Sequence, residues 1–225
     1  MAPPARSASA PDRPLLCRER ILCAAVRVVD AEGLGALTMR RLAKDLGVGT
    51  MSLYTYFPNK EDLLDGVIGA VLSEICIPVP RADDSIASAR HILREFRRVA
   101  TRHPNLVPLL TSRAPATPEG LRVLEAGFDA LRRAGVDPAG AVQAYRLLVS
   151  FAIGFVSLEV GGFFRQSAEA TSGMLPLDPP LAEEFPRIVE AGPHLLEWDP
   201  DAEFEAGADF MFSLLRRQGG ENGGG

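Results

Sequence analysis

Basic and short polar side chains gather between residues 38 and 60 in a pattern suited to contacting DNA. A guanidinium such as that of Arg40 can donate two hydrogen bonds to the N7 and O6 atoms of guanine, or hold a phosphate. Short hydroxyls and a thioether suit base edges and thymine methyl groups, whereas Tyr54 and Lys60 suit phosphates, which position a protein without reading sequence. The candidate DNA-contacting residues are Arg40, Arg41, Lys44, Thr50, Met51, Ser52, Tyr54, Thr55, Tyr56 and Lys60.

Two short helices joined by a tight turn would position these side chains. Thr38 is a favourable N-cap for the first helix, and Gly47 stands where its end needs a left-handed residue. Helical spacing in the second helix, over 50–56, turns Leu53 and Phe57 inward. Such a helix–turn–helix inserts the exposed face of its second helix into a major groove of DNA. The alternative is an ordinary helical hairpin with a solvated basic face.

The distribution of charge favours the DNA-binding interpretation. The whole chain of 225 residues has a net charge of −5, which is not typical of a nucleic-acid binder. Residues 1–60, however, contain nine Lys or Arg against five Asp or Glu, so the remainder of the chain is strongly acidic. Basic charge is therefore concentrated where the helix–turn–helix is predicted.

The same region contains a long, ordered pattern of residues. Its parts are Ala24-Ala25, Gly33, Leu37-Thr38-Met39-Arg40-Arg41-Leu42-Ala43, Leu46-Gly47-Val48, Ser52-Leu53-Tyr54-Thr55-Tyr56-Phe57 and Asn59-Lys60-Glu61-Asp62-Leu63-Leu64. Through this pattern residues 21–64 resemble the DNA-binding domain of the TetR family, the tetracycline-repressor-like regulators. The resemblance implies that the positions named above contact DNA. Thr50 and Thr55 stand where tetracycline repressors typically place larger groups, so the operator sequence should differ.

The sequence also predicts helices in the rest of the chain, and no alternating strand pattern occurs. Capping residues followed by proline mark three helix starts, at Thr117, Asp137 and Asp199. We expect helices over 16–32, 39–46, 50–56, 60–75, 85–103, 106–111, 118–134, 138–164, 181–191 and 200–217, with a long mobile crossover over 165–180. The predicted fold is all-α, with an N-terminal helix–turn–helix domain and a larger helical ligand-binding and dimerisation domain. Its segments are a disordered tail (1–13), the DNA-binding domain (14–60), a connecting helix (61–76), the larger domain (77–217) and a second disordered tail (218–225).

The helices predicted over 138–164 and 200–217 are more apolar than one buried face requires. Two such helices, doubled by a two-fold axis, would form a four-helix bundle, and the equivalent pair is the dimer interface in the TetR family. Burial in the core of a monomer is the alternative. The residues predicted at a homodimer interface are Tyr145, Val149, Ala152, Val156, Phe204, Ala208, Met211 and Leu215, with Phe210 and Phe212 outside the stripe.

Aromatic residues in the larger domain indicate an apolar pocket for a small-molecule inducer, although ordinary core packing also explains aromatics. The candidate ligand-binding residues are Phe96, Leu109, Arg113, Phe128, Tyr145, Phe151, Phe155, Glu159 and Trp198. The segments 102–106 and 111–113 resemble the C-terminal domain of the tetracycline-repressor subgroup. Two histidines that engage drug and magnesium there align with Cys76 and Pro108. We therefore expect no metal, no cofactor and an inducer unrelated to tetracycline.

Several classes of protein are not supported by the sequence. It contains no phosphate-binding glycine loop, no nucleophile elbow and no metal-spaced His/Cys cluster, so we expect no enzyme. Cys17, Cys23 and Cys76 are expected to be buried small residues, with a redox sensor as the alternative. The apolar run 147–158 is too short to span a bilayer, and no apolar signal region opens the chain, which favours the cytoplasm. The predicted function is a repressor that binds a palindromic operator on double-stranded DNA; the alternative is a helical small-molecule scavenger without DNA function.

Overall fold

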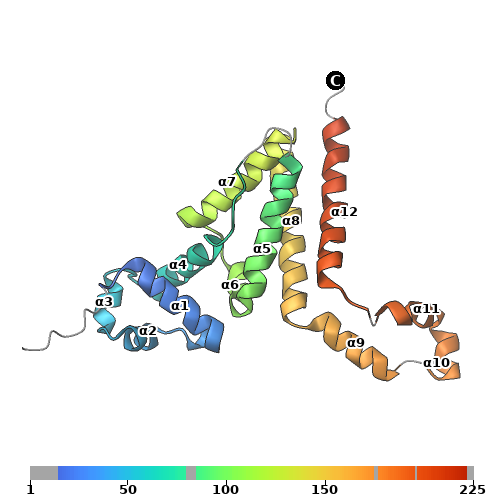
Figure 1. Cartoon of the computed structure of the whole chain (residues 1–225), viewed down its shortest axis with the longest axis horizontal. Helices are drawn as coiled ribbons and strands as arrows, with labels where there is room; N and C mark the ends of the chain where they lie inside the picture. The colour runs from blue at the N-terminus through green and yellow to red at the C-terminus, as the bar shows by residue number, and fades with distance from the viewer. Residues whose placement is uncertain (1–14, 80–84, 175–176, 196, 222–225) are drawn as a thin grey trace, which may run out of the picture.

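The computed structural model describes residues 15–79, 85–174, 177–195 and 197–221, and every regular element in these ranges is a helix. Figure 1 shows a small N-terminal unit at one end, a central bundle, and an arm of short helices at the other end. The helices are α1 (Arg18–Glu32), η1 (Leu34–Ala36), α2 (Met39–Leu46), α3 (Thr50–Tyr54), α4 (Lys60–Leu72), α5 (Ser85–Arg102), η2 (Pro104–Leu106), α6 (Val107–Ser112), α7 (Pro118–Arg133), α8 (Pro138–Val160), α9 (Phe163–Met174), α10 (Pro179–Glu184), α11 (Pro186–Leu195) and α12 (Pro200–Glu221).

Local capping explains the form of the N-terminal unit. The Thr38 hydroxyl accepts a hydrogen bond from the Arg41 amide at 3.1 Å, and Gly47 ends α2 in the left-handed conformation, with φ of 68°. Both features confirm the predicted first helix and turn. Leu53 and Phe57 are fully buried, as predicted, although α3 ends at Tyr54, two residues earlier than expected.

The central bundle places α8 between α5 and α7 on one side and α12 on the other (Figure 1). The three predicted caps are present: side chains of Thr117, Asp137 and Asp199 accept hydrogen bonds from the amides that open α7, α8 and α12. The core of the bundle is formed by buried residues that include Leu131, Leu148, Ala152, Phe204 and Phe212.

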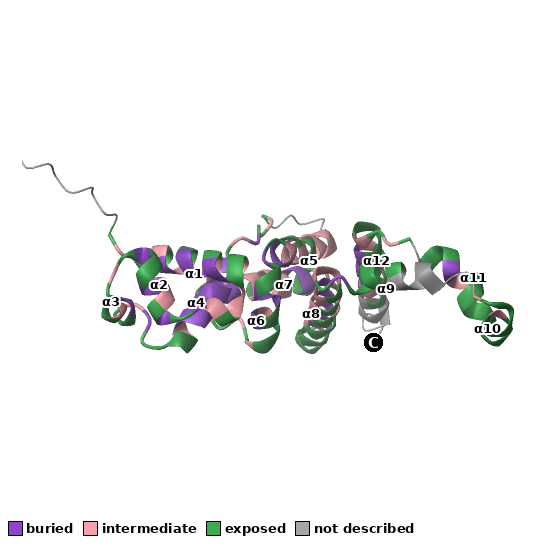
Figure 2. Cartoon of the chain, turned by 90° about the horizontal axis from the view of Figure 1, so that it is seen from below, coloured by how far each residue is buried: buried purple, intermediate pink, exposed green. Residues whose placement is uncertain are grey.

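The predicted crossover over 165–180 is wrong. The helix predicted over 138–164 stops at Val160, because Gly162 adopts φ of 68°, and α9 starts immediately afterwards. Short helices α10 and α11 follow, and Figure 2 shows that they are largely exposed and extend away from the bundle. The C-terminal tail predicted from 218 is also wrong at its start, since α12 continues to Glu221. The predicted tail 1–13 and residues 222–225 lie outside the described residues.

The dimer face predicted from sequence is also corrected. Phe204, Ala208 and Phe212 of α12 are at most 1% exposed because they pack against α8 of the same protomer. Ala152 and Val156 are likewise buried within the protomer, and Met211 packs partly against the same core. Phe210, by contrast, is 63% exposed. Leu215 has a side chain outside the described set, and Tyr145 and Val149 line a cavity described below.

By length and composition alone, helix α8 could cross a membrane. The sequence-based prediction considered only residues 147–158 and therefore underestimated the length of this apolar helix. Its inner face packs against α5, α7 and α12, which is the packing of a core helix. Only 28% of its most apolar stretch is buried in the protomer, however. An apolar outer face of α8 is therefore uncovered.

Candidate DNA-binding surface and inner cavity

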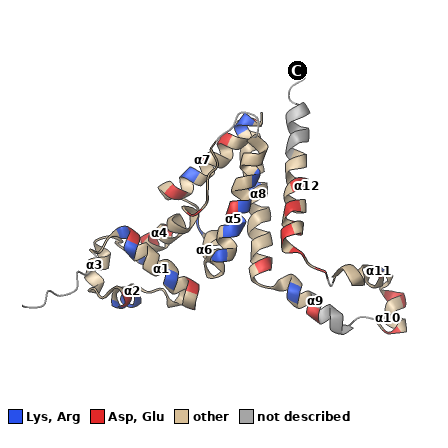
Figure 3. Cartoon of the chain, in the orientation of Figure 1, with Lys and Arg blue, Asp and Glu red and all other residues tan. Residues whose placement is uncertain are grey.

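The exposed face of α3 and the turn after it form the candidate DNA-binding surface. Met51 is 77% exposed, Ser52, Tyr54 and Thr55 are also exposed, and Thr50 is half-buried. Arg40, Lys44 and Lys60 are exposed and have no ion-pair partner among the residues that the structure describes. Figure 3 shows Lys and Arg on α1 and α2, beside α3. The surface can therefore contact both base edges and phosphates.

Arg41, by contrast, is held by two ion pairs. Its guanidinium donates to both carboxylate oxygens of Glu32 in α1, at 2.6 and 3.0 Å, and to Asp45, at 2.8 and 3.1 Å. The hydrogen bonds to Glu32, followed by those to Asp45, raise the pKa of Arg41, and the pairing with Arg41 lowers the pKa of Glu32. Arg41 thus fastens α2 to α1, and its assignment as a DNA contact is not supported.

Tyr56 was also predicted to contact DNA, but its side chain is directed toward the start of the chain's first helix. Its hydroxyl donates to the Leu16 carbonyl at 2.6 Å, and its ring packs partly against the N-terminal core. Arg18 of α1 adds two contacts to the same segment. It donates to the Tyr56 carbonyl at 2.8 Å, and its guanidinium lies 4.1 Å from the centre of the Phe57 ring. We therefore assign Tyr56 to holding the start of α1 against the helix–turn–helix.

A cavity of about 140 Å³ lies between α4, α5, α7 and α8, beside the loop that joins α6 to α7. Of the predicted ligand-binding residues, Phe96, Arg113 and Tyr145 line it. The remaining lining is mostly aliphatic, and it could not be predicted because aliphatic residues are typical of any core. The principal lining residues missed from sequence are Ile68, Leu72, Leu93, Val123, Leu124, Leu148 and Ile153.

The other predicted ligand residues lie elsewhere. Phe151 and Phe155 pack on the Phe204 ring, with centroids 5.3 and 5.2 Å away. Glu159 pairs with Arg97 at 2.7 Å, and this hydrogen bonding raises the pKa of Arg97. Leu109 is buried in the core, and the Phe128 ring packs beside the cavity, 5.4 Å from the Tyr145 ring. Trp198 contacts α9, where its ring lies 5.8 Å from the Phe164 ring. Phe128, Phe151 and Phe155 pack against the core of the bundle, and none of these six residues lines the cavity.

Helix α4 connects the cavity to the N-terminal unit. Ile68 and Leu72 of α4 line the cavity, and α4 begins at Lys60, six residues after α3 ends. The helix packs closely on the start of α7, since a Cβ at Gly69 would lie 2.6 Å from the Thr117 hydroxyl. Arg113, before α7, donates to Asp65 of α4 at 2.7 Å and pairs with Glu61. The cavity and the N-terminal unit therefore share α4.

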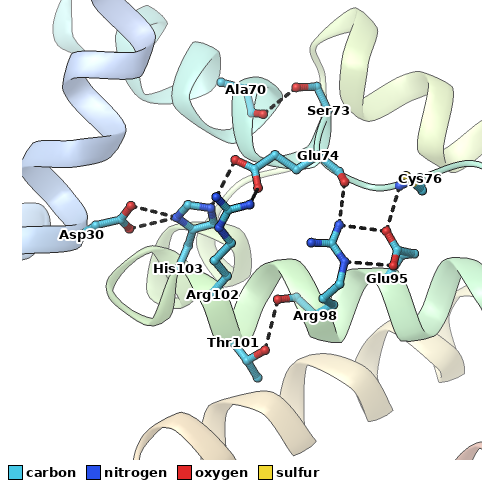
Figure 4. Close-up of polar contacts among 10 residues, drawn as sticks. All are labelled: Asp30, Ala70, Ser73, Glu74, Cys76, Glu95, Arg98, Thr101, Arg102 and His103. Atoms are coloured by element: carbon cyan, nitrogen blue, oxygen red, sulfur yellow. Dashed lines mark hydrogen bonds and ion pairs between the residues drawn. The ribbon is translucent and has the colours of Figure 1, made fainter.

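A second junction joins α1, the end of α4 and α5 through His103, as Figure 4 shows. His103 is 5% exposed, and its Nδ1 lies 2.9 and 3.0 Å from the carboxylate oxygens of Asp30. Its Nε2 lies 3.3 Å from Glu74, which also accepts a hydrogen bond from Arg102 at 3.0 Å (Figure 4). The Nδ1 contacts have the geometry of hydrogen bonds to Asp30, whereas Nε2 is buried near Glu74 without hydrogen-bond geometry.

Replacing His103 with phenylalanine should lower the free energy of unfolding by about 1–3 kcal/mol, because Asp30 would lose its buried hydrogen-bond partner. Chemical denaturation of wild type and variant measures this difference. The control is Arg102→Met, which removes a pair whose arginine is 65% exposed and should cost about 0–1 kcal/mol. Equal losses in the two variants would contradict a special contribution of His103.

The three cysteines differ from expectation. Cys17, Cys23 and Cys76 are free thiols with exposed side chains, so the prediction that they are buried is wrong. Cys76 lies in the chain after α4, where its amide donates to Glu95 at 3.0 Å (Figure 4).

Known proteins share both parts of this architecture. Residues 21–67 match the family described as bacterial regulatory proteins, tetR family, and residues 89–174 match the tetracyclin repressor-like C-terminal domain. The chain is 32% identical over 163 residues to the HTH-type transcriptional repressor DrrR1 of Streptomyces coeruleorubidus, a match covering 72% of this chain but only 59% of that protein. It is 31% identical over 205 residues to the Tetracycline repressor protein class A from transposon 1721 of Escherichia coli, covering 88% of this chain and 89% of the repressor.

Solved structures agree with these matches. The Streptomyces coelicolor TetR family protein ActR, in complex with actinorhodin, superposes with a TM-score of 0.79 at 30% identity, covering 92% of this chain and 99% of ActR. Profile matches to both halves, full-length relatives and the shared architecture lead to one conclusion: the chain belongs to the TetR family of DNA-binding transcriptional regulators.

Proposed function

We propose that this protein is a repressor that binds a palindromic operator as a homodimer and leaves it when a small molecule occupies the inner cavity. One observation carries the proposal: α4 contributes Ile68 and Leu72 to the cavity and also leads directly out of the helix–turn–helix. The ligand complex of ActR supports it by similarity. Binding in the cavity would tilt α4 and change the separation of the two reading helices, which a dimer must hold about one DNA turn apart.

The exposed apolar residues support a dimer formed by the outer faces of α8 and α12. On α8, Leu147 and Leu158 are 51% and 39% exposed, and the exposed Ser150 and Gly154 lie between them on the same helical face. On α12, Phe210 is exposed on the face that points away from the protomer core. Small residues between large ones allow helices of two protomers to approach closely, so we assign these outer faces to the two-fold interface. We place the protein in the cytoplasm, where it would reach its operator.

Selection from random DNA duplexes tests the proposal. The protein should enrich an inverted repeat whose half-site centres lie about 10 base pairs, or a multiple of one helical turn, apart. Enrichment of single half-sites, or of no sequence at all, would contradict a dimeric repressor.

Two basic residues should separate positioning from reading. Lys60→Ala should weaken binding by a similar factor on every sequence, because Lys60 at the start of α4 is placed to contact a phosphate. Arg40→Ala should in addition change base preference, by about 1–3 kcal/mol at the position it reads. Binding of both variants to single-base operator mutants measures this. A shift in preference for Lys60→Ala as large as that for Arg40→Ala would reverse the assignment.

A further inference from the structure

Arg113 is the single charged side chain among the described residues that line the cavity. Nearly all of the remaining lining is apolar, and the Tyr145 hydroxyl has no hydrogen-bond partner in the part of the chain that the structure describes. Burial raises the pKa of Tyr145, so its hydroxyl stays a neutral donor. An anion that entered such a cavity would lose its hydration, and a buried charge is tolerated only when it is paired.

The same guanidinium is held by α4. Arg113 is 24% exposed, whereas its partners Asp65 and Glu61 are 43% and 65% exposed and therefore lie toward solvent. A guanidinium has five donors in a fixed plane and binds carboxylates in a bidentate manner. Arg113 thus stands between an apolar cavity and two carboxylates of the helix that leads to the DNA-binding surface.

We infer that the cavity binds an apolar molecule carrying one acidic group, and that this group competes with Asp65 and Glu61 for Arg113. The inference rests on the proposed function, because it names the ligand class of that cavity. Binding would draw the guanidinium inward, break its contacts to α4, and so couple occupancy of the cavity to release of the operator. A volume of about 140 Å³ is close to the ~150 Å³ cavity that holds a benzene ring, so the conformation described here fits one ring.

A matched pair of one-ring probes tests the ligand class. At neutral pH benzoate is an anion, and benzamide is its neutral counterpart of nearly the same shape. Titration calorimetry should give at least tenfold tighter binding of the benzoate to the wild-type protein, and only the benzoate should release operator DNA. Equal binding of both probes, or binding of neither, would overturn the inference.

Four variants separate the roles of the residues. Arg113→Met should remove the preference for the benzoate and leave benzamide affinity within about threefold, while Arg113→Lys should keep part of the preference. Asp65→Asn should raise benzoate affinity at least about fivefold, because one competing carboxylate is lost, and leave benzamide affinity unchanged. A purely structural role of Asp65 would not strengthen binding, so an unchanged or weaker benzoate affinity would contradict the competition.

The fourth variant confirms where the probe binds. A Cβ at Gly127 would meet nothing within 4 Å, so Gly127→Leu can fill the cavity without displacing Arg113. It should abolish binding of both probes and keep operator binding. Operator binding without probe is measured for every protein: its absence in the wild type refutes the proposed repressor, whereas intact operator binding with no benzoate preference refutes only the ligand class. Benzoate bound equally by Gly127→Leu would locate the probe outside the cavity and overturn the inference.

Discussion

Phe210→Asp should convert the protein from a dimer to a monomer and reduce operator affinity at least about 100-fold. Phe210 is the most exposed aromatic side chain of α12, at 63%, and the proposed two-fold interface would bury it. A carboxylate in that position would be buried without a partner, which costs about 3 kcal/mol or more. Sedimentation velocity measures the assembly state, and titration with operator DNA measures the affinity.

Two aspartate variants on the same helix serve as controls. Ala202→Asp lies about 12 Å along α12 from Phe210, in the first turn, where the helix dipole favours an acid, and should leave the dimer intact. Ala208→Asp enters the protomer core and should unfold the bundle, which circular dichroism detects as lost helicity. A folded Phe210→Asp dimer that still binds operator would place the interface elsewhere.

The contrast between Phe210 and Ala208 explains what the sequence could and could not predict about assembly. As predicted, α8 and α12 each carry apolar side chains on an exposed face as well as on the buried one. A helix that is apolar on most sides, however, does not reveal which stripe packs within the protomer and which meets a partner. The predicted interface included Ala208 and Ala152, but those side chains belong to the core in which α8 packs on α12.

The N-terminal unit was predicted well because its signals are local. Caps, a left-handed glycine and helical spacing are determined by neighbouring residues, so Thr38, Gly47 and Leu53 could be assigned from sequence alone. Long-range pairs could not: Arg41 meets Glu32, and Tyr56 meets Leu16, only after α1 has folded back on the helix–turn–helix. The prediction that Arg41 and Tyr56 contact DNA therefore rested on residue type alone.

The cavity illustrates the same limit. Aromatic residues were expected to line it, but Phe151 and Phe155 fill the centre of the bundle around Phe204 because large rings contribute most to close packing. The cavity remains where smaller side chains of α4, α7 and α8 leave space. Arg113 and Glu159 were both predicted to bind ligand, but only Arg113 lines the cavity, because Glu159 pairs with Arg97. Neither this pair nor that of Arg113 with Asp65 could be predicted without the fold.

Raising the monovalent salt concentration from 50 to 200 mM should weaken operator binding by about 10³-fold. Arg40, Lys44 and Lys60 are exposed without an ion-pair partner among the described residues, so a dimer brings about six positive charges against the DNA, and each offsets phosphate charge whether it lies at a base edge or at a phosphate. Each contact releases condensed counterions from DNA, so the logarithm of the binding constant should fall with the logarithm of salt with a slope of about −5. Operator titrations at four or more salt concentrations measure the slope.

Arg41 makes this prediction specific. Because its guanidinium is already occupied by Glu32 and Asp45, Arg41→Ala should leave the salt slope unchanged, whereas Lys44→Ala should reduce its magnitude by about two, one contact being lost in each subunit. Any loss of affinity in Arg41→Ala should instead accompany a loss of stability, since α2 would no longer be fastened to α1. A slope that fell equally in both variants would show that Arg41 leaves its carboxylate partners for the phosphates when the protein binds DNA.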